Sequence, residues 1–161
     1  MECKVEIGAD KLNLCFRVSG YATYVDAIQV SKFLNVILNN NNFDLVTFDL
    51  SSCEKMDSTF MGIIASLACE NEDGNGLNVQ VAKCSPTSLQ CLEDLGLTKL
   101  VTLVDEWNDE DMVFLALKNI EYGSKEQHEI IYLSHKALSA INECNREKFS
   151  AVIDALNVEN H

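Results

Sequence analysis

Hydrophobic residues recur along the chain with two different periods, which predict strands in some segments and helices in others. Alternate residues are apolar in 3–7 and again in 12–18, and the turn residues 8–10 between them predict a hairpin of two strands. Apolar residues then recur at three- and four-residue steps over 27–38, which is the spacing of an amphipathic helix. A continuous apolar run at 45–50 predicts a strand that is covered on both faces.

The middle of the chain continues this alternation of strands and helices. A short polar turn follows the buried strand, and helical spacing of apolar residues begins at Ser58. A loop at 73–76 precedes a strand expected at 77–81. Ser85 followed by Pro86 has the residue types of a helix N-cap and first helical position, so a further helix is expected there.

These elements predict an α/β fold. A last strand is expected at 100–104 and a helix at 108–119. The ββαβαβ order implies a mixed sheet, largely parallel with right-handed crossovers, that is covered by helices. We assign residues 1–120 to one domain and residues 121–161 to a helical C-terminal extension.

The extension carries a strip of apolar residues that has to be buried. Its members recur at three- and four-residue steps and predict one long helix or a pair of helices. An exposed strip of this kind would be adhesive, so we expect it to pack on the domain or on a second copy, and packing within one chain is favoured. The strip consists of Ile130, Leu133, Ala137, Ile141, Cys144, Val152 and Leu156.

Composition narrows the classes of partner. The 161 residues carry a net charge of −13 without a basic cluster, so nucleic acid and anionic membrane are not expected as partners. No apolar run approaches the roughly 20 residues of a membrane span. The odd number of cysteines, seven, and their irregular spacing indicate reduced thiols. We therefore expect a cytoplasmic protein without a signal peptide, metal site or cofactor.

The candidate chemistry lies where the helix beginning near Ser58 follows the buried strand. Asp57, Ser58 and Thr59 stand at this helix start, where unpaired N–H groups and the positive end of the helix dipole meet an anion. A phosphorylated hydroxyl would find these donors in place. Asp, Ser and Thr are also the usual N-caps, and residue type and spacing alone favour the capping interpretation.

A family resemblance favours the phosphorylation interpretation instead. The chain resembles the signature of the STAS family at three places, namely Asp49-Leu50-Ser51, Met56-Asp57-Ser58-Thr59 and Met61-Gly62. The resemblance spans roughly residues 1–118. In the anti-sigma factor antagonist branch the matching serine is the phosphoacceptor, which here is Ser58. The family pattern has glycine where this chain has Phe60, and the added bulk beside the acceptor would affect recognition by a kinase.

The resemblance implies a function without catalysis. The unphosphorylated protein would bind a serine kinase that is also an anti-sigma factor, and a metal-dependent serine phosphatase would reverse the phosphorylation. Around Ser58 we expect support from Asp57 and Thr59, with Thr59 a secondary acceptor. The candidate site is completed by Asp26, Met61 and Asp49. Family members place the Asp26 region near the acceptor, and Asp49 is also a candidate cap at the strand end.

Other function classes stay open at this point. We expect a monomer or a homodimer formed through the extension. The chain could instead be a scaffold or assembly subunit that oligomerises through the same segment. It could also be a nucleotide or small-ligand sensor that uses the helix start as an anion site. A serine hydrolase is disfavoured because the G-x-S-x-G motif is absent and the first 127 residues contain no histidine. His128 and His135, seven residues apart in the extension, are too few ligands for a catalytic metal site.

Overall fold

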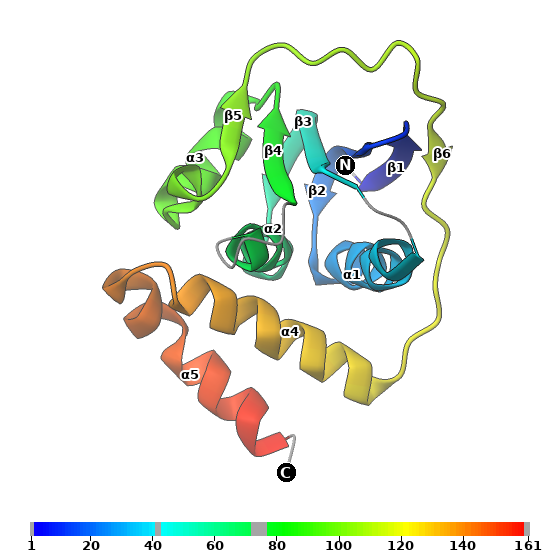
Figure 1. The fold of residues 1–161 in the computed structure, drawn as a ribbon. Helices are drawn as coiled ribbons and strands as arrows, with labels where there is room; N and C mark the ends of the chain where they lie inside the picture. The colour runs from blue at the N-terminus through cyan, green and yellow to red at the C-terminus, as the bar shows by residue number, and fades with distance from the viewer. Residues whose placement is uncertain (1, 41–42, 72–76, 160–161) are drawn as a thin grey trace.

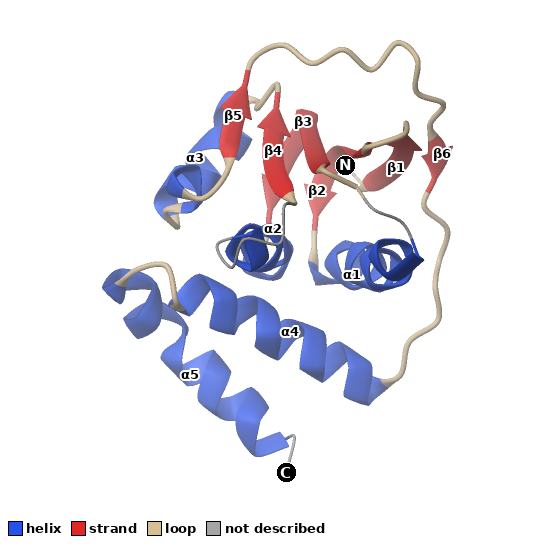
Figure 2. Cartoon of the chain, viewed as in Figure 1, coloured by secondary structure: helices blue, strands red, loops and turns tan. Residues whose placement is uncertain are grey.

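The protein folds as a mixed sheet with helices layered on one of its faces (Figures 1 and 2). The computed structural model describes residues 2–40, 43–71 and 77–159, so the expected loop at 73–76 lies outside the described residues. Its elements are β1 (Lys4–Ala9), β2 (Asn13–Ala22), α1 (Tyr24–Asn40), β3 (Leu45–Met56), α2 (Ser58–Asn71), β4 (Asn78–Ala82), α3 (Pro86–Asp94), the 3₁₀ turn η1 (Leu97–Lys99), β5 (Thr102–Val104), β6 (Leu115–Ala116), α4 (Ser124–Ser139) and α5 (Glu143–Glu159).

The sheet has the strand order β5-β4-β3-β2-β1-β6. Strands β2 to β5 run parallel to one another, while β1 pairs antiparallel with both β2 and β6. The predicted mixed α/β sheet is confirmed, and the predicted ββαβαβ order holds from β1 to β4. Helix α3 begins at Pro86 with Ser85 as its N-cap, and Gly96 follows its end with a φ of 77°.

Aromatic side chains join the sheet to the helices above it. The rings of Phe16 in β2 and Phe48 in β3 stack with centroids 5.3 Å apart. Phe33 of α1 meets Phe16 edge-on, and Phe60 of α2 meets Phe48 in the same way. Helices α1 and α2 therefore share one face of the sheet, where edge-to-face pairs add to the burial of apolar area.

The buried strand β3 is longer than its apolar run. The polar turn expected after Leu50 is wrong, because β3 continues to Met56 and stays paired with β2 as far as Ala22. The register shifts between Arg17 and Ser19, so the polar residues of β3 enter the ladder through a bulge. Backbone hydrogen bonds to a neighbouring strand override the local turn propensity of this polar segment.

The helix expected at 108–119 is also wrong, because this segment is extended. Residues 105–114, here called the strap, lead from β5 at one edge of the sheet to β6 at the other edge (Figure 1). Strand β6 then pairs with β1, and the Leu117 N–H donates to the Val5 carbonyl at 2.9 Å. The backbone N–H and C=O groups of β6 thus form hydrogen bonds with the open edge of β1, whereas in a helix they would have bonded within the segment.

Arg17 of β2 fastens the strap to the sheet. Its guanidinium lies 3.7 Å from the ring centroid of Phe114, pairs with Asp109, and stands 3.8 Å from the carboxylate of Asp49. Phe114 fits against Gly8, where a Cβ would lie 2.9 Å from the ring. Asp49 is only 2% exposed, so its charge depends on Arg17 and on two hydrogen bonds from Ser51.

The C-terminal extension forms a helical hairpin that packs on the domain. Helix α4 crosses over α2 and α1, and α5 packs back along α4 (Figure 1). At the bend, the side-chain amide of Asn145 donates to the carbonyls of Leu95 and Leu138, both at 2.9 Å. Leu138 is fully buried and belongs to the hydrophobic core. Within one chain, this core is contacted by Ile130, Ala137 and Ile141 of the apolar strip, whereas Leu133 stays 51% exposed. The expected packing within one chain holds for that part of the strip.

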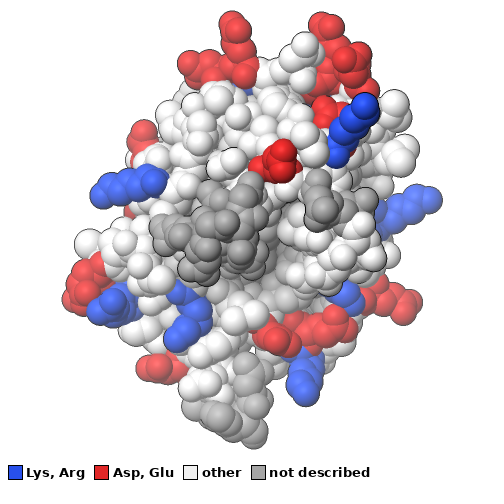
Figure 3. Space-filling view, viewed as in Figure 1, with Lys and Arg blue, Asp and Glu red and all other residues white. Residues whose placement is uncertain are grey.

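Two further features concern the surface and the thiols. Acidic side chains gather where the strap runs (Figure 3), and within it Asp105, Glu106, Glu110 and Asp111 are exposed.

All seven cysteines are free thiols, and burial raises the pKa of Cys53 to about 11. Among the described residues, no helix combines the length and apolar character needed to cross a membrane.

Replacement of Arg17 tests whether the strap anchor stabilises the fold. Arg17→Gln should lower the free energy of unfolding by about 2 kcal/mol, because the buried Asp49 carboxylate loses its counter-charge. Arg146→Gln is the matched control: its pair with Glu143 is 66% and 70% exposed, so its loss should change little. Urea unfolding followed by circular dichroism measures both. Equal effects of the two changes would show that Arg17 does not anchor the strap.

Candidate functional site

Ser58 is the first residue of α2, and Asp57 caps the helix. The Asp57 carboxylate accepts the N–H of Phe60 at 2.9 Å, and its carbonyl accepts the N–H of Met61 at 3.1 Å. This is the N-cap geometry, with the side chain bonded to the third helical residue. Because Asp57 provides the cap, the half-buried hydroxyl of Ser58 is not needed for that purpose.

The starts of α1 and α2 lie next to each other. The Asp57 N–H donates to the Ala22 carbonyl at 2.9 Å, and the Asp57 carboxylate also accepts the N–H of Tyr24, the first residue of α1. Burial raises the pKa of Asp57 above its ordinary value in spite of these hydrogen bonds. Ser58 thus stands beside a carboxylate that is costly to keep ionised, at the positive ends of two helices.

The extension brings a histidine to Ser58. The Oγ of Ser58 lies 2.9 Å from Nε2 of His135 in α4. The Nδ1 of His135 lies 2.8 Å from the carbonyl of Ile131, which can only accept, so we assign the proton to Nδ1. With the proton on Nδ1 and none on Nε2, the Ser58 hydroxyl donates to Nε2. His135 is 4% exposed, and the ring of Phe149 in α5 packs 5.2 Å from it.

Sequence reasoning did not connect His135 with Ser58. It did note that any base for Ser58 would have to come from the extension. His135 is not a member of the apolar strip, but it lies three residues before the buried Leu138, one turn along α4. A buried histidine needs partners for two ring nitrogens, and a half-buried hydroxyl at a helix start is a suitable one.

Helices α2 and α4 meet most closely one turn after Ser58. A Cβ added to Gly62 would lie 2.6 Å from both the Cβ and the carbonyl oxygen of Ser134. Ser134 is fully buried and its hydroxyl donates to the Ile130 carbonyl at 2.7 Å. Glycine at position 62 therefore allows the backbones to approach, and this approach carries the neighbouring His135 to Ser58.

The Ser58–His135 pair has part of the arrangement of a hydrolase. A hydroxyl that donates to imidazole is the first contact of a nucleophile with its base. Here the second nitrogen of His135 donates to a backbone carbonyl, while the Asp57 carboxylate accepts N–H groups of two helix starts. The imidazole therefore lacks an orienting carboxylate. Among the described residues, no group of three His, Cys, Asp or Glu side chains could hold a metal ion.

Three residues that follow Ser58 in the motif point into the protein. Thr59 is 5% exposed and Met61 is 7% exposed, so both lie beneath the surface at the helix start. Phe60 is fully buried against Phe48. The expectation that Phe60 adds bulk beside the acceptor is therefore wrong, since its ring fills the space between α2 and the sheet.

Asp26 and Asp49 occupy different surroundings. The Asp26 carboxylate accepts the N–H of Thr23 at 2.9 Å, which makes it part of the cap of α1. It also lies beside the partly buried thiol of Cys3, and desolvation together with the Asp26 charge strongly raises the pKa of that thiol. Asp49 stands inside β3, so its expected role as a cap at the strand end is wrong. A partner could reach Asp49 only after the strap had moved.

Two solved structures that superimpose on this chain are described as anti-sigma factor antagonists. The structure of the unphosphorylated antagonist SpoIIAA superimposes with a TM-score of 0.56 at 16% identity, over 63% of this chain and 89% of that one. A putative anti-sigma factor antagonist from Thermotoga maritima gives a TM-score of 0.53 at 17% identity, over 61% of this chain and 82% of its own. The chain has the STAS fold. No model of a known protein family matches the sequence, and no curated protein does.

The likeness to these structures leaves more than a third of this chain outside the aligned part. At this level of identity it establishes the STAS fold alone. It does not extend to the role of any residue, which has to come from the geometry.

Two substitutions of Asp57 separate its cap from its charge. Asp57→Ala should cost about 1 kcal/mol of stability through loss of the cap, whereas Asp57→Asn keeps a capping oxygen. Because burial raises the folded-state pKa above 3.8, the Asp57 contribution is most favourable at low pH and declines as pH rises through that pKa. The stability of Asp57→Asn relative to wild type should therefore increase between about pH 3.5 and about pH 7. A flat difference in urea titrations over this range would contradict the buried charge.

Proposed function

We propose that the chain is an anti-sigma factor antagonist that is switched by phosphorylation of Ser58. The observation that carries the proposal is a hydroxyl at the first position of α2, in a STAS fold, that a neighbouring aspartate has relieved of capping. The proposed partners are a serine kinase that acts as an anti-sigma factor and a metal-dependent serine phosphatase. A cytoplasmic location belongs to the same proposal.

The unphosphorylated chain is the form that binds the kinase in this scheme. Phosphorylation adds a charge of about −1.5 to −2 at Ser58. The new charge would stand next to Asp57, in a protein that already carries −13. Groups of the partner that fit a neutral Ser58 hydroxyl would then lie against a phosphate dianion that has lost its water. This would weaken the complex.

The residues around Ser58 act on this switch indirectly. Asp57 fixes the first turn of α2, and Asp26 fixes the first turn of α1 beside it. Thr59 and Met61 hold the same turn from the buried side, which makes Thr59 a poor acceptor. Ser58 is thus the hydroxyl at this helix start that a kinase could reach with the least rearrangement.

Phosphate mapping tests the acceptor. Protein recovered from its own cells in the presence of phosphatase inhibitors should carry one phosphate in the peptide that contains Ser58. Ser58→Ala should remove it, whereas Thr59→Ala, at the adjacent hydroxyl, should retain it. Mass spectrometry of the three proteins gives the result. Undiminished phosphate on Ser58→Ala would overturn the assignment of the acceptor.

Charge at position 58 should weaken binding to the kinase. Each serine kinase of the anti-sigma type from the same cells can be titrated by calorimetry with wild type, Ser58→Asp and Ser58→Ala. The aspartate variant should bind at least tenfold more weakly, because its fixed charge imitates part of the phosphate. Ser58→Ala is the neutral comparison and should bind no more weakly than wild type. Equal affinities of all three would show that this helix start is not the interface.

A further inference from the structure

The closest packing of the extension lies over the candidate phosphoacceptor. Gly62 follows Ser58 by one helical turn and lies on the same side of α2. Ser134 fills the space beside Gly62, and His135 reaches the oxygen of Ser58 at 2.9 Å. A phosphoryl group needs room for three oxygens next to this Oγ. The imidazole takes up part of that room beside the half-buried Ser58, so α4 in its docked position hinders modification of the hydroxyl.

Helix α5 and the bend close the contact from outside. Phe149 of α5 is 6% exposed and covers the ring of His135. The bend is held by Asn145, which is 2% exposed and donates to the carbonyl at the end of α3, Leu95. The α4–α5 hairpin therefore rests on α2 and on the end of α3, in addition to its contact with α1.

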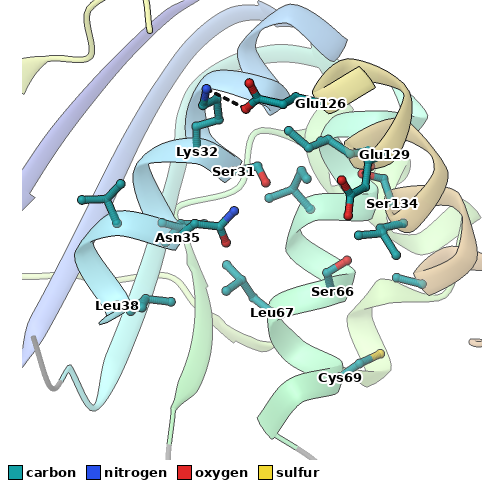
Figure 4. A pocket seen from close by; sticks show the side chains of 16 residues that line it. Ser31, Lys32, Asn35, Leu38, Ser66, Leu67, Cys69, Glu126, Glu129 and Ser134 are labelled. Atoms are coloured by element: carbon teal, nitrogen blue, oxygen red, sulfur yellow. Dashed lines mark hydrogen bonds and ion pairs between the residues drawn. The ribbon is translucent and has the colours of Figure 1, made fainter. Parts of the chain in front are cut away.

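Toward α1 the hairpin fits less well. A cavity of about 590 Å³ remains between α1, α2 and α4 (Figure 4). Leu133 of α4, on its wall, is 51% exposed, and the ion pair across it joins Lys32 to the exposed Glu126 at 2.7 Å. Exposed ion pairs contribute little, and unfilled apolar space forfeits packing energy. The hairpin thus packs closely on α2 at Gly62, beside Ser58, and leaves the cavity between α1, α2 and α4 unfilled.

We propose that the α4–α5 hairpin is an intramolecular competitor, a lid that occupies the Ser58 face of α2 until a protein partner displaces it. Tight contact at Gly62 keeps Ser58 covered in the resting chain. Because the cavity between α1, α2 and α4 is unfilled, a partner with a better-fitting apolar surface can gain contacts that α4 does not make. The inference rests on the proposed function for the identity of the partner, whereas the cover itself can be measured without one.

Thiol labelling measures how often the lid opens. In a Ser58→Cys background, iodoacetamide should modify the introduced thiol slowly, while the exposed native Cys144 reports the reactivity of the reagent. Adding Gly62→Ala should raise the rate at position 58 at least tenfold, because its Cβ forces α4 away. Asn145→Ala, remote from Ser58, should do the same by freeing the bend. Gly123→Ala is the matched control, since nothing lies within 4 Å of its Cβ.

Peptide-resolved mass spectrometry reads each site, and stability adds a second measure. On a free helix face, glycine to alanine gains about 1 kcal/mol, so a loss of stability in Gly62→Ala marks the docked lid. If that variant does not fold, Asn145→Ala decides the matter. Equal labelling of position 58 in all backgrounds would overturn the lid, even if Ser58 proved to be phosphorylated. Faster labelling in a protein that carries no phosphate would retain the lid and reject the switch.

Discussion

Helix α2 is apolar on nearly all its sides, and the arrangement of the layers depends on this constraint. Phe60 and Ile64 are fully buried toward the sheet, while Ile63 and Leu67 on the other side are 7% and 6% exposed. A helix that is hydrophobic all round has to be covered all round, and one sheet covers one side of it. Helix α4 supplies the second cover. The extension therefore completes the core, although α4 begins twenty residues after the end of β5 and eight residues after the end of β6.

The same constraint accounts for the surroundings of Ser58. Glycine inside a helix costs about 1 kcal/mol relative to alanine, and at position 62 the close approach of α4 offsets that cost. The approach buries His135, whose ring nitrogens then need partners. The Ile131 carbonyl satisfies one nitrogen and the Ser58 hydroxyl the other. The hydroxyl that the motif marks as an acceptor thus also belongs to the interface that holds the extension in place.

Local signals in the sequence were enough for most of the domain. Period and capping residues identified the hairpin, the helices and the strand before α2, because those elements satisfy their own backbone groups or follow a clear apolar pattern. The predictions are wrong where contacts between residues far apart in the sequence determine the secondary structure. The polar end of β3 is a strand because β2 pairs with it, and 108–119 is extended because Arg17 and the edge of β1 hold it.

The candidate site divides in the same way. The motif placed Ser58 at a helix start, which the structure shows. His135 is 77 residues away along the chain, and no local period reports such a contact. An indirect signal was present in α2, whose apolar residues at both Ile63 and Ile64 require cover on two sides. Followed through, that pattern predicts that some other helix lies against the Ser58 face.

A lid over the interface would link stability to binding in both directions. If the Ser58 face is open in a fraction of molecules, the apparent dissociation constant of a partner rises by the inverse of that fraction. An open fraction of about 1% would weaken binding about 100-fold, which corresponds to about 2.7 kcal/mol. By reciprocity the bound partner weakens the docking of α4 by the same free energy. The complex would then expose the side of α4 around Leu138, which is buried in the resting chain. The released hairpin would itself present an apolar surface, so the switch would change two faces of the protein at once.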